Sequence, residues 1–131
     1  RAGRVAEHRL ELSGVTRTDR YREKHRCAMK IVTAGDVTLD RAWAAVDLAR
    51  IADATVRLHW TDEPYVWHTN DGVEVFVVLD GAVDMHYRDE AGTHVTRLEP
   101  GRIFVAEDGD EHVAHPVGTA RILVIERAGS I

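Results

Sequence analysis

The sequence HTNDGVEVFVVLDG, residues 68–81, decides the fold of this chain. Its second half is a short apolar run that ends at Asp80-Gly81, a dipeptide that suits a tight turn with positive φ. We therefore predict a strand over residues 73–79 that forms a hairpin with residues 82–88. Both faces of the first strand are mostly apolar, so we expect it to be covered on both sides.

Similar short runs continue on either side of this stretch. Residues 36–40 are typical of a turn, and residues 41–51 fit either one helical turn or an irregular strand. Short strands separated by Gly or Pro turns every eight to twelve residues indicate an all-β sandwich or barrel. The further strands that we expect are residues 30–33, 54–60, 94–98, 102–106, 111–114 and 120–126.

Length and charge limit the possible functions. The 131 residues suffice for one domain, and 44% of them are hydrophobic, which allows a packed core. The net charge is −5, yet residues 1–28 hold eight basic and four acidic residues, so the remainder is strongly acidic. We expect a charged N-terminal arm over residues 1–28 and a β-domain over residues 29–131. The acidic body argues against nucleic acid as a partner.

Two further features concern the setting of the protein. No apolar run is long enough for a membrane span, and the first 28 residues are charged rather than apolar, unlike a signal peptide. Cys27 is the single cysteine and has no internal disulfide partner. We therefore expect a reducing, cytoplasmic location. Only two of the seventeen basic residues are Lys, a bias common in GC-rich bacterial genomes.

Three side chains in the β-rich part of the chain form a candidate metal site. Glu74 is a carboxylate on a strand covered on both sides, so it needs a metal, a cation or a proton; the alternative is a Glu at an edge or paired with Arg. His68 and His112 supply two imidazoles. Two His and one carboxylate are the ligand set of many first-row metal sites with open positions. Asn70, two residues from His68, points the same way in an extended segment, and its amide oxygen is a weak ligand.

Other residues are candidates for completing the site or shaping a pocket. His86 and His59 are possible additional ligands, whereas His115 has the opposite strand parity to His112 and is not expected to face the same centre. Aromatic residues are expected first to pack in the core, and those that face inward also shape a pocket at the barrel mouth. The aromatic candidates are Tyr65, Trp67, Phe76 and Phe104.

The spacing of these residues resembles that of the cupins, a superfamily of small β-barrels. The first cupin motif is G-x5-H-x-H-x3-4-E-x6-G, and this chain has His68-Thr69-Asn70, Glu74 and Gly81 at that spacing. The second motif is G-x5-P-x-G-x2-H-x3-N, and the chain has Gly101, Gly109 and His112 at that spacing. The resemblance covers roughly residues 50–127. The residues that depart from the motifs are Asp62, Asn70, Glu107 and Pro116.

The resemblance implies a double-stranded β-helix, or jelly-roll barrel, behind the N-terminal arm. It also implies that His68, Glu74 and His112 hold one divalent transition metal (Zn, Ni, Fe or Mn) and that Asn70 stands in for the fourth ligand. Small cupins are frequently homodimers, paired at barrel edges or by a swapped N-terminal strand, for which residues 10–12 are the candidate.

Three functions fit this reading of the sequence. The first is a metal-dependent enzyme, such as an oxygenase or isomerase, that acts on a small organic molecule. The second is a non-catalytic module that binds or senses a small ligand with weak metal binding or none, which the Asn70 departure favours. The third is an interaction protein whose barrel is filled by side chains.

Overall fold

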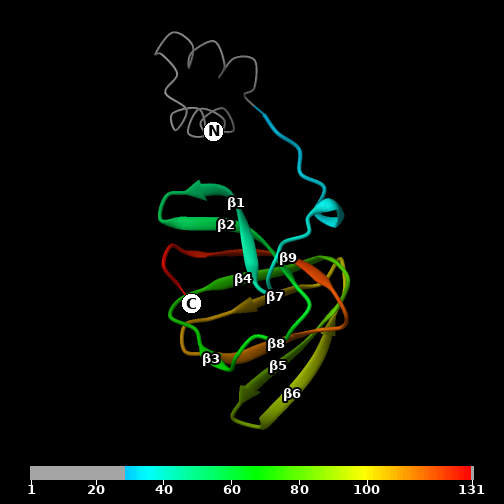
Figure 1. Cartoon of the computed structure of the whole chain (residues 1–131). Coiled ribbons are helices and arrows are strands. Elements are labelled where there is room, and N and C mark those ends of the chain that lie inside the picture. The colour runs from blue at the N-terminus through cyan, green and yellow to red at the C-terminus, as the bar shows by residue number, and fades with distance from the viewer. Residues whose placement is uncertain (1–28, 131) are drawn as a thin grey trace. The chain divides into compact units, whose positions relative to one another are not determined.

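Regular structure in the described part of the chain consists of strands and one short 3-10 helix, with no α-helix (Figure 1). The computed structural model describes residues 29–130. The predicted arm and its candidate swapped strand, residues 10–12, lie outside the described residues. The elements in chain order are η1 (Ala34–Asp36), β1 (Ala44–Ile51), β2 (Ala54–Thr61), β3 (His68–Thr69), β4 (Glu74–Asp80), β5 (Val83–Asp89), β6 (Gly92–Leu98), β7 (Ile103–Ala106), β8 (Glu111–Pro116) and β9 (Ala120–Arg127).

The strands form two antiparallel sheets that face each other as a jelly roll, as the sequence predicts. One sheet has the order β1-β2-β9-β4-β7 and the other has the order β3-β8-β5-β6. In Figure 1 the five-stranded sheet lies above the four-stranded one, with the chain passing back and forth between them. A site built from both sheets therefore collects residues that are far apart in the sequence.

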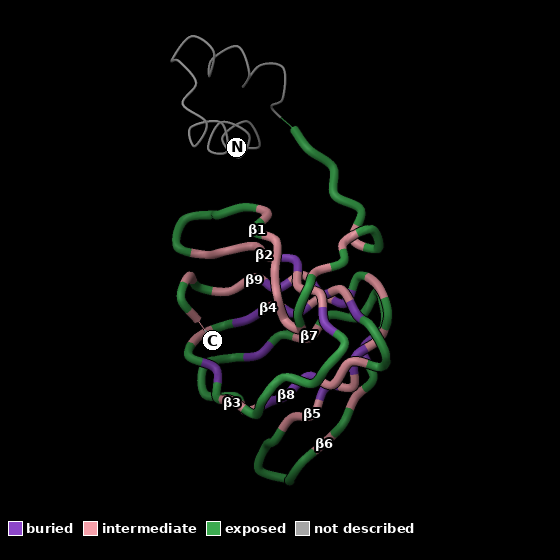
Figure 2. Tube along the Cα trace, viewed as in Figure 1, coloured by how far each residue is buried: buried purple, intermediate pink, exposed green. Residues whose placement is uncertain are grey.

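The core fills the space between the two sheets because each strand turns alternate residues inward. Figure 2 shows the buried segments along the facing strands, while the outer loops are exposed. On β4 the inward residues are Glu74, Phe76 and Val78, the face opposite Val75 and Val77. The central apolar cluster is made of Phe76, Val78, Val83, Met85, Leu98, Ala114, Ala120, Ile122 and Val124.

The predicted hairpin between β4 and β5 is wrong. β4 pairs with β7 and β9, whereas β5 pairs with β6 and β8 in the other sheet. The Asp80-Gly81 turn carries the chain from one sheet to the next. Gly81 has φ +80°, and a Cβ at this position would lie 2.3 Å from the carbonyl oxygen of Thr119. The turn predicted at Asp80-Gly81 is present, but its residues do not specify how the strands on either side of it pair.

The remaining strand predictions agree with the structure in most places. Of the two alternatives for residues 41–51, the irregular strand is confirmed, because β1 has a shift in its pairing with β2 between Asp47 and Ala49. The strand predicted over residues 30–33 does not form. In the described part of the chain no helix has the length and apolar character needed to cross a bilayer.

Candidate metal centre

The two histidines of the predicted site come together through the pairing of β3 with β8. His68 on β3 lies directly opposite His112 on β8, and such cross-strand neighbours point to the same face of a sheet. Their ring centroids are 4.4 Å apart at an angle of 63°. His112 is fully buried, whereas His68 is partly exposed. The short strand β3 therefore brings the first imidazole beside the second.

The third side chain comes from the opposite sheet. Glu74 is the first residue of β4 and has an exposed fraction of 8%. Its Oε1 atom lies 3.1 Å from Nε2 of His112, yet Oε1 has no hydrogen-bond partner of acceptable geometry. The Nε2 atom instead donates to Oδ1 of Asn70, 2.8 Å away, so its one proton is not available to Glu74. A buried carboxylate in this state needs a metal, another cation or a proton.

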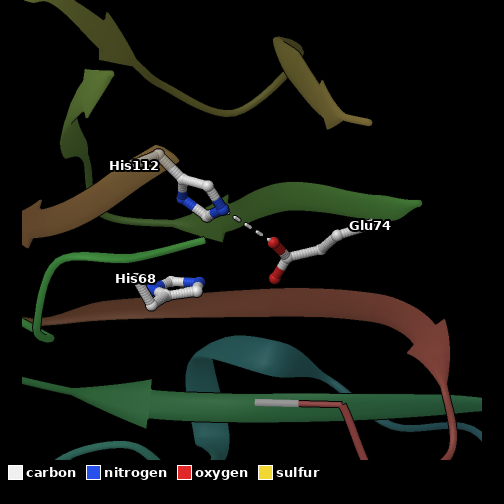
Figure 3. Close-up of side chains that lie close together, drawn as sticks. All are labelled: His68, Glu74 and His112. Atoms are coloured by element: carbon white, nitrogen blue, oxygen red, sulfur yellow. Dashed lines mark ion pairs between the residues drawn. The ribbon is translucent and has the colours of Figure 1, made fainter. Parts of the chain in front are cut away.

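The three side chains converge on a shared space between the sheets. Figure 3 shows His112, His68 and Glu74 entering it from three directions. One nitrogen from each histidine and one carboxylate oxygen all lie within 4.8 Å of one another. This donor set, with the unsatisfied carboxylate oxygen at its centre, fits a first-row transition metal held by three protein ligands with positions left open.

Hydrogen bonds fix the orientation of the His68 ring. Its Nδ1 atom lies 3.0 Å from the carbonyl oxygen of Val66, which can only accept, so Nδ1 carries the proton. The Nε2 atom of a neutral His68 therefore keeps its lone pair for a metal. Metal-binding histidines in proteins are usually oriented in this way.

Asn70 holds the second histidine. Its Oδ1 atom lies 2.8 Å from Nε2 of His112, and its Nδ2 donates to the carbonyl oxygen of Gly72 over 3.2 Å. The contact with Gly72 fixes which end of the amide faces the histidine, because only the NH₂ group can donate to a carbonyl. Asn70 is 5% exposed, and its oxygen lies beside one of the three candidate ligands, His112.

The three candidate ligands line a cavity of about 190 Å³. Two of the predicted pocket residues, Tyr65 and Phe76, line it as well. The rest of the wall comes from residues that the sequence analysis did not assign to a pocket, namely Trp43, Arg57, His59, Ala114, Val124, Glu126 and Ser130. The signal for two of them was the face of β2 opposite its apolar residues, where Arg57 and His59 alternate.

Burial shifts the pKa of two residues in this wall. Burial, with a further contribution from Glu74, raises the pKa of Glu126 to about 7. Glu126 and Glu74 face each other across β9 and β4, so two carboxylates share one side of the cavity. Burial lowers the pKa of His59 below its usual value, against the opposing effect of its bond to the Trp43 backbone.

Three of the predicted pocket residues lie elsewhere. Trp67 lies under the guanidinium of Arg88, 3.8 Å from the ring centroid, in a separate hollow that it shares with His68. Phe104 packs against the core with its ring centroid 5.4 Å from that of His112. His86 does not line the cavity.

His86 instead lies beside a histidine that was not expected to face the centre. Its ring centroid is 4.1 Å from that of His115, on the residues of β5 and β8 that alternate with the core positions. His86 and His115 therefore form a pair on the other face of the four-stranded sheet.

Comparison with known proteins supports the fold. No protein-family model and no curated protein matches the sequence. A cupin-2 domain containing protein from Shewanella frigidimarina is 27% identical, with a TM-score of 0.61 over 68% of this chain and 84% of that one. A cupin superfamily protein from Desulfitobacterium hafniense is 14% identical, with a TM-score of 0.60 over 72% of this chain and 85% of that one.

An enzyme is also among the similar structures. A hydroquinone 1,2-dioxygenase solved in complex with Fe³⁺ is 16% identical, with a TM-score of 0.61 over 69% of this chain and 29% of that one. At this level of identity the likeness concerns the fold alone.

Proposed function

We propose that this chain, a small cupin, binds one divalent transition metal ion through His68, Glu74 and His112 in order to act on a small organic molecule. The observation that carries the proposal is the buried Glu74 oxygen, which has no hydrogen-bond partner and lies 3.1 Å from a histidine nitrogen. A metal ion at the meeting point of the three side chains would satisfy it. Zn, Ni, Fe and Mn all accept this donor set.

The cavity beside the three ligands limits the size of the molecule. An engineered apolar cavity of about 150 Å³ holds benzene, so the 190 Å³ found here accommodates a molecule of one ring or less. Tyr65 and Phe76 supply apolar walls, while Arg57 and Glu126 supply polar ones. This mixture fits a ligand with an aromatic or aliphatic body and a few polar groups.

We propose that the chemistry is that of a metal-dependent oxygenase or isomerase. A bound metal supplies Lewis acidity, or an oxygen-binding position if it is iron. Two residues of the chain position the histidine ligands: Val66 keeps Nε2 of His68 available, and Asn70 holds the His112 ring. A dioxygenase with Fe³⁺ shares the fold, which is compatible with this proposal.

The second candidate is a module that binds a small ligand without catalysis. Asn70 favours it, because an amide oxygen already bonded to His112 stands where the first cupin motif has a second histidine. Such a site holds its metal more weakly than a set with three imidazoles. Both candidate functions place a small molecule in the cavity, and they differ in whether the protein converts that molecule.

Metal analysis of the purified protein tests the site. We expect close to one equivalent of a transition metal in the wild type and less than about a tenth of that in His68→Ala and Glu74→Ala, because each variant removes one of three protein ligands. His94→Ala is the matched control, since His94 on β6 bonds to Asp89 on β5, outside the site. Equal metal contents in all four proteins would contradict the proposal.

Turnover separates the enzyme from the binding module. We propose measuring oxygen uptake and product formation by the metal-loaded protein with diketones, catechols and sugar phosphates. Conversion that disappears in Glu74→Ala supports the enzyme. Binding of one of these compounds without conversion supports the second candidate.

We also propose that the protein is a homodimer. Val75 and Val77 lie opposite Val105 and Ile103 on the face of the five-stranded sheet that points away from the core. Ile103 is 62% exposed and Val105 is 52% exposed, and both lie on β7, an edge strand of its sheet. Contiguous exposed apolar surface beside an open strand edge is typical of a protein interface.

A further inference from the structure

His59 faces the cavity from β2, which lies in the same sheet as the strand of Glu74 and opposite the sheet that carries His68 and His112. It lies on β2 directly opposite Ile122 of β9, which is fully buried in the core, so the His59 side chain also points inward. It lines the same cavity as His68, Glu74 and His112. The sequence offers His59 only as a possible additional ligand, and the three candidate ligands do not include it.

A single hydrogen bond decides what the His59 ring can offer to a ligand. Its Nδ1 atom lies 3.1 Å from the backbone carbonyl oxygen of Trp43. A carbonyl oxygen can only accept, so Nδ1 carries the proton and Nε2 of the neutral ring is left as an acceptor. Among the described residues this is the one hydrogen bond found for the His59 ring.

The Trp43 residue that provides this carbonyl oxygen has a strained backbone conformation. Trp43 has φ +63°, a region that a bulky residue rarely adopts. Three interactions hold it there: its backbone N–H donates to the oxygen of Trp60 over 2.9 Å, its Nε1 donates to the oxygen of Glu63 over 2.8 Å, and its ring packs edge-on against Tyr65 at 5.2 Å. Non-glycine residues in strained conformations cluster at functional sites.

The surroundings of His59 keep the ring neutral. Burial lowers the pKa of His59, and the nearby Arg57 lowers it further, while the Trp43 bond and the carboxylates of Glu74 and Asp47 act in the opposite sense. A neutral imidazole with a fixed tautomer presents a lone pair rather than a charge. The cavity wall at this position therefore recognises a hydrogen-bond donor.

We propose that His59 is a ligand-positioning residue whose Nε2 atom accepts a hydrogen bond from a hydroxyl group of the molecule held beside the metal. The inference rests on the proposed function and narrows its substrate class. The ligand is a small molecule, of one ring or less, that carries a hydroxyl group next to the atoms by which it coordinates the metal. Vicinal diols and catechols have this arrangement.

Two substitutions at His59 separate its acceptor from its structural role. His59→Asn keeps an N–H close to the position of Nδ1, and so the bond to Trp43, but it has no acceptor at the position of Nε2. His59→Gln places an amide oxygen near that position. His86→Asn is the matched control, because His86 lies against His115 outside the cavity. Zinc content and thermal melting are measured on every variant to show that the site and the fold are intact.

The affinity of the zinc-loaded protein for 4-nitrocatechol, followed by visible absorption, is the main readout. We expect His59→Asn to raise the Kd about tenfold, which corresponds to the loss of one hydrogen bond. We expect His59→Gln to raise it less and His86→Asn to leave it unchanged, with equal zinc in all four proteins. Nitrogen NMR of the imidazoles should show the His59 proton on Nδ1 in the wild type.

Each contrary result identifies what has failed. If zinc-loaded His59→Asn binds 4-nitrocatechol as tightly as the wild type, or if the proton lies on Nε2, the role of His59 is wrong and the metal site stands. If the zinc-loaded wild type does not bind 4-nitrocatechol, the inferred substrate class is wrong. A wild type that retains no zinc overturns the proposed function, and the inference falls with it.

Discussion

Asn70 holds the His112 ring in the metal-free protein, and beside a bound metal its amide oxygen can act as a ligand. In the structure its amide oxygen accepts from Nε2 of His112, the nitrogen that faces Glu74. A metal ion that takes this nitrogen must displace its proton, so metal affinity depends on what Asn70 offers in exchange. Once Nε2 has lost its proton, the amide oxygen no longer accepts a hydrogen bond from the ring, and it can join the metal ligands instead.

This role of Asn70 predicts how substitutions at residue 70 change the affinity of the protein for zinc. Asn70→Ala should lower the affinity for zinc about tenfold, because partners that orient a metal ligand usually contribute 10- to 100-fold. Asn70→Asp should raise it, since a carboxylate adds negative charge beside the ion. Competition with a chromophoric chelator measures both values. An Asn70→Ala protein that binds zinc more tightly than the wild type would mean that Asn70 only competes with the metal.

Glu126 gives the metal-free protein a pH-dependent stability. Its pKa is about 7 in the folded state against 4.5 for the ordinary carboxyl, so the folded protein binds more protons between these values. The free energy of unfolding therefore falls as the pH rises from about 4.5 to 7. A bound metal would offset the charge of Glu74 and reduce this effect.

The variant Glu126→Gln removes the titrating group from the cavity wall. In the presence of EDTA we expect it to be more stable than the wild type at pH 8 by roughly 1–2 kcal/mol, a value reduced for the partial exposure of the site. The difference should vanish as the pH approaches 4.5. Urea unfolding across this range measures it, and Glu90→Gln on the β5–β6 turn controls for the loss of an acidic side chain. A constant difference at all pH values would contradict the assignment.

At the scale of elements, the turn between β4 and β5 determines how the two sheets are connected. Gly81 combines a left-handed backbone with a close approach to Thr119, on the segment that leads into β9. Gly118 has a similar φ of +70° but no atom within 4 Å of an added Cβ. The two glycines therefore separate the cost of backbone strain from the cost of a steric clash.

We expect Gly118→Ala to lower the free energy of unfolding by about 1 kcal/mol, the cost of the left-handed conformation. Gly81→Ala should lower it by about 3 kcal/mol or more, because overpacking against a backbone oxygen is added to that cost. Urea unfolding of both variants measures the difference. Equal losses would mean that the backbone at Thr119 moves aside freely.

The elements also show how far the sequence predicts this fold. The apolar run in β4 predicted a strand covered on both sides and hence a buried Glu74. The burial of Glu74 is confirmed, but cover on both sides is wrong, because only the face of Glu74 is buried and Leu79 on the other face is 43% exposed. The motif spacing brought Glu74 to His68 and His112. The partner of β4 was predicted wrongly, since an Asp-Gly turn is equally suited to a hairpin and to a corner between sheets. The inward position of Arg57 was missed because polar residues on a strand usually indicate a solvent-exposed face, whereas His59 was expected only as a possible additional ligand.

At the scale of the whole molecule, the apolar outer face of the five-stranded sheet is the surface through which we expect two copies of the chain to pair. Its exposed residues Ile103 and Val105 lie on β7, and a second copy placed against them would bury both. Ile103→Lys and Val105→Lys should each convert a dimer to a monomer, because a charge in an apolar interface is costly. Val95→Lys is the control, since Val95 is 56% exposed but lies on β6 of the other sheet.

Light scattering after gel filtration should give twice the chain mass for the wild type and the control, and the chain mass for the two β7 variants. A monomeric wild type at micromolar concentration would exclude the homodimer and leave the metal centre unaffected, because its three candidate ligands come from one chain.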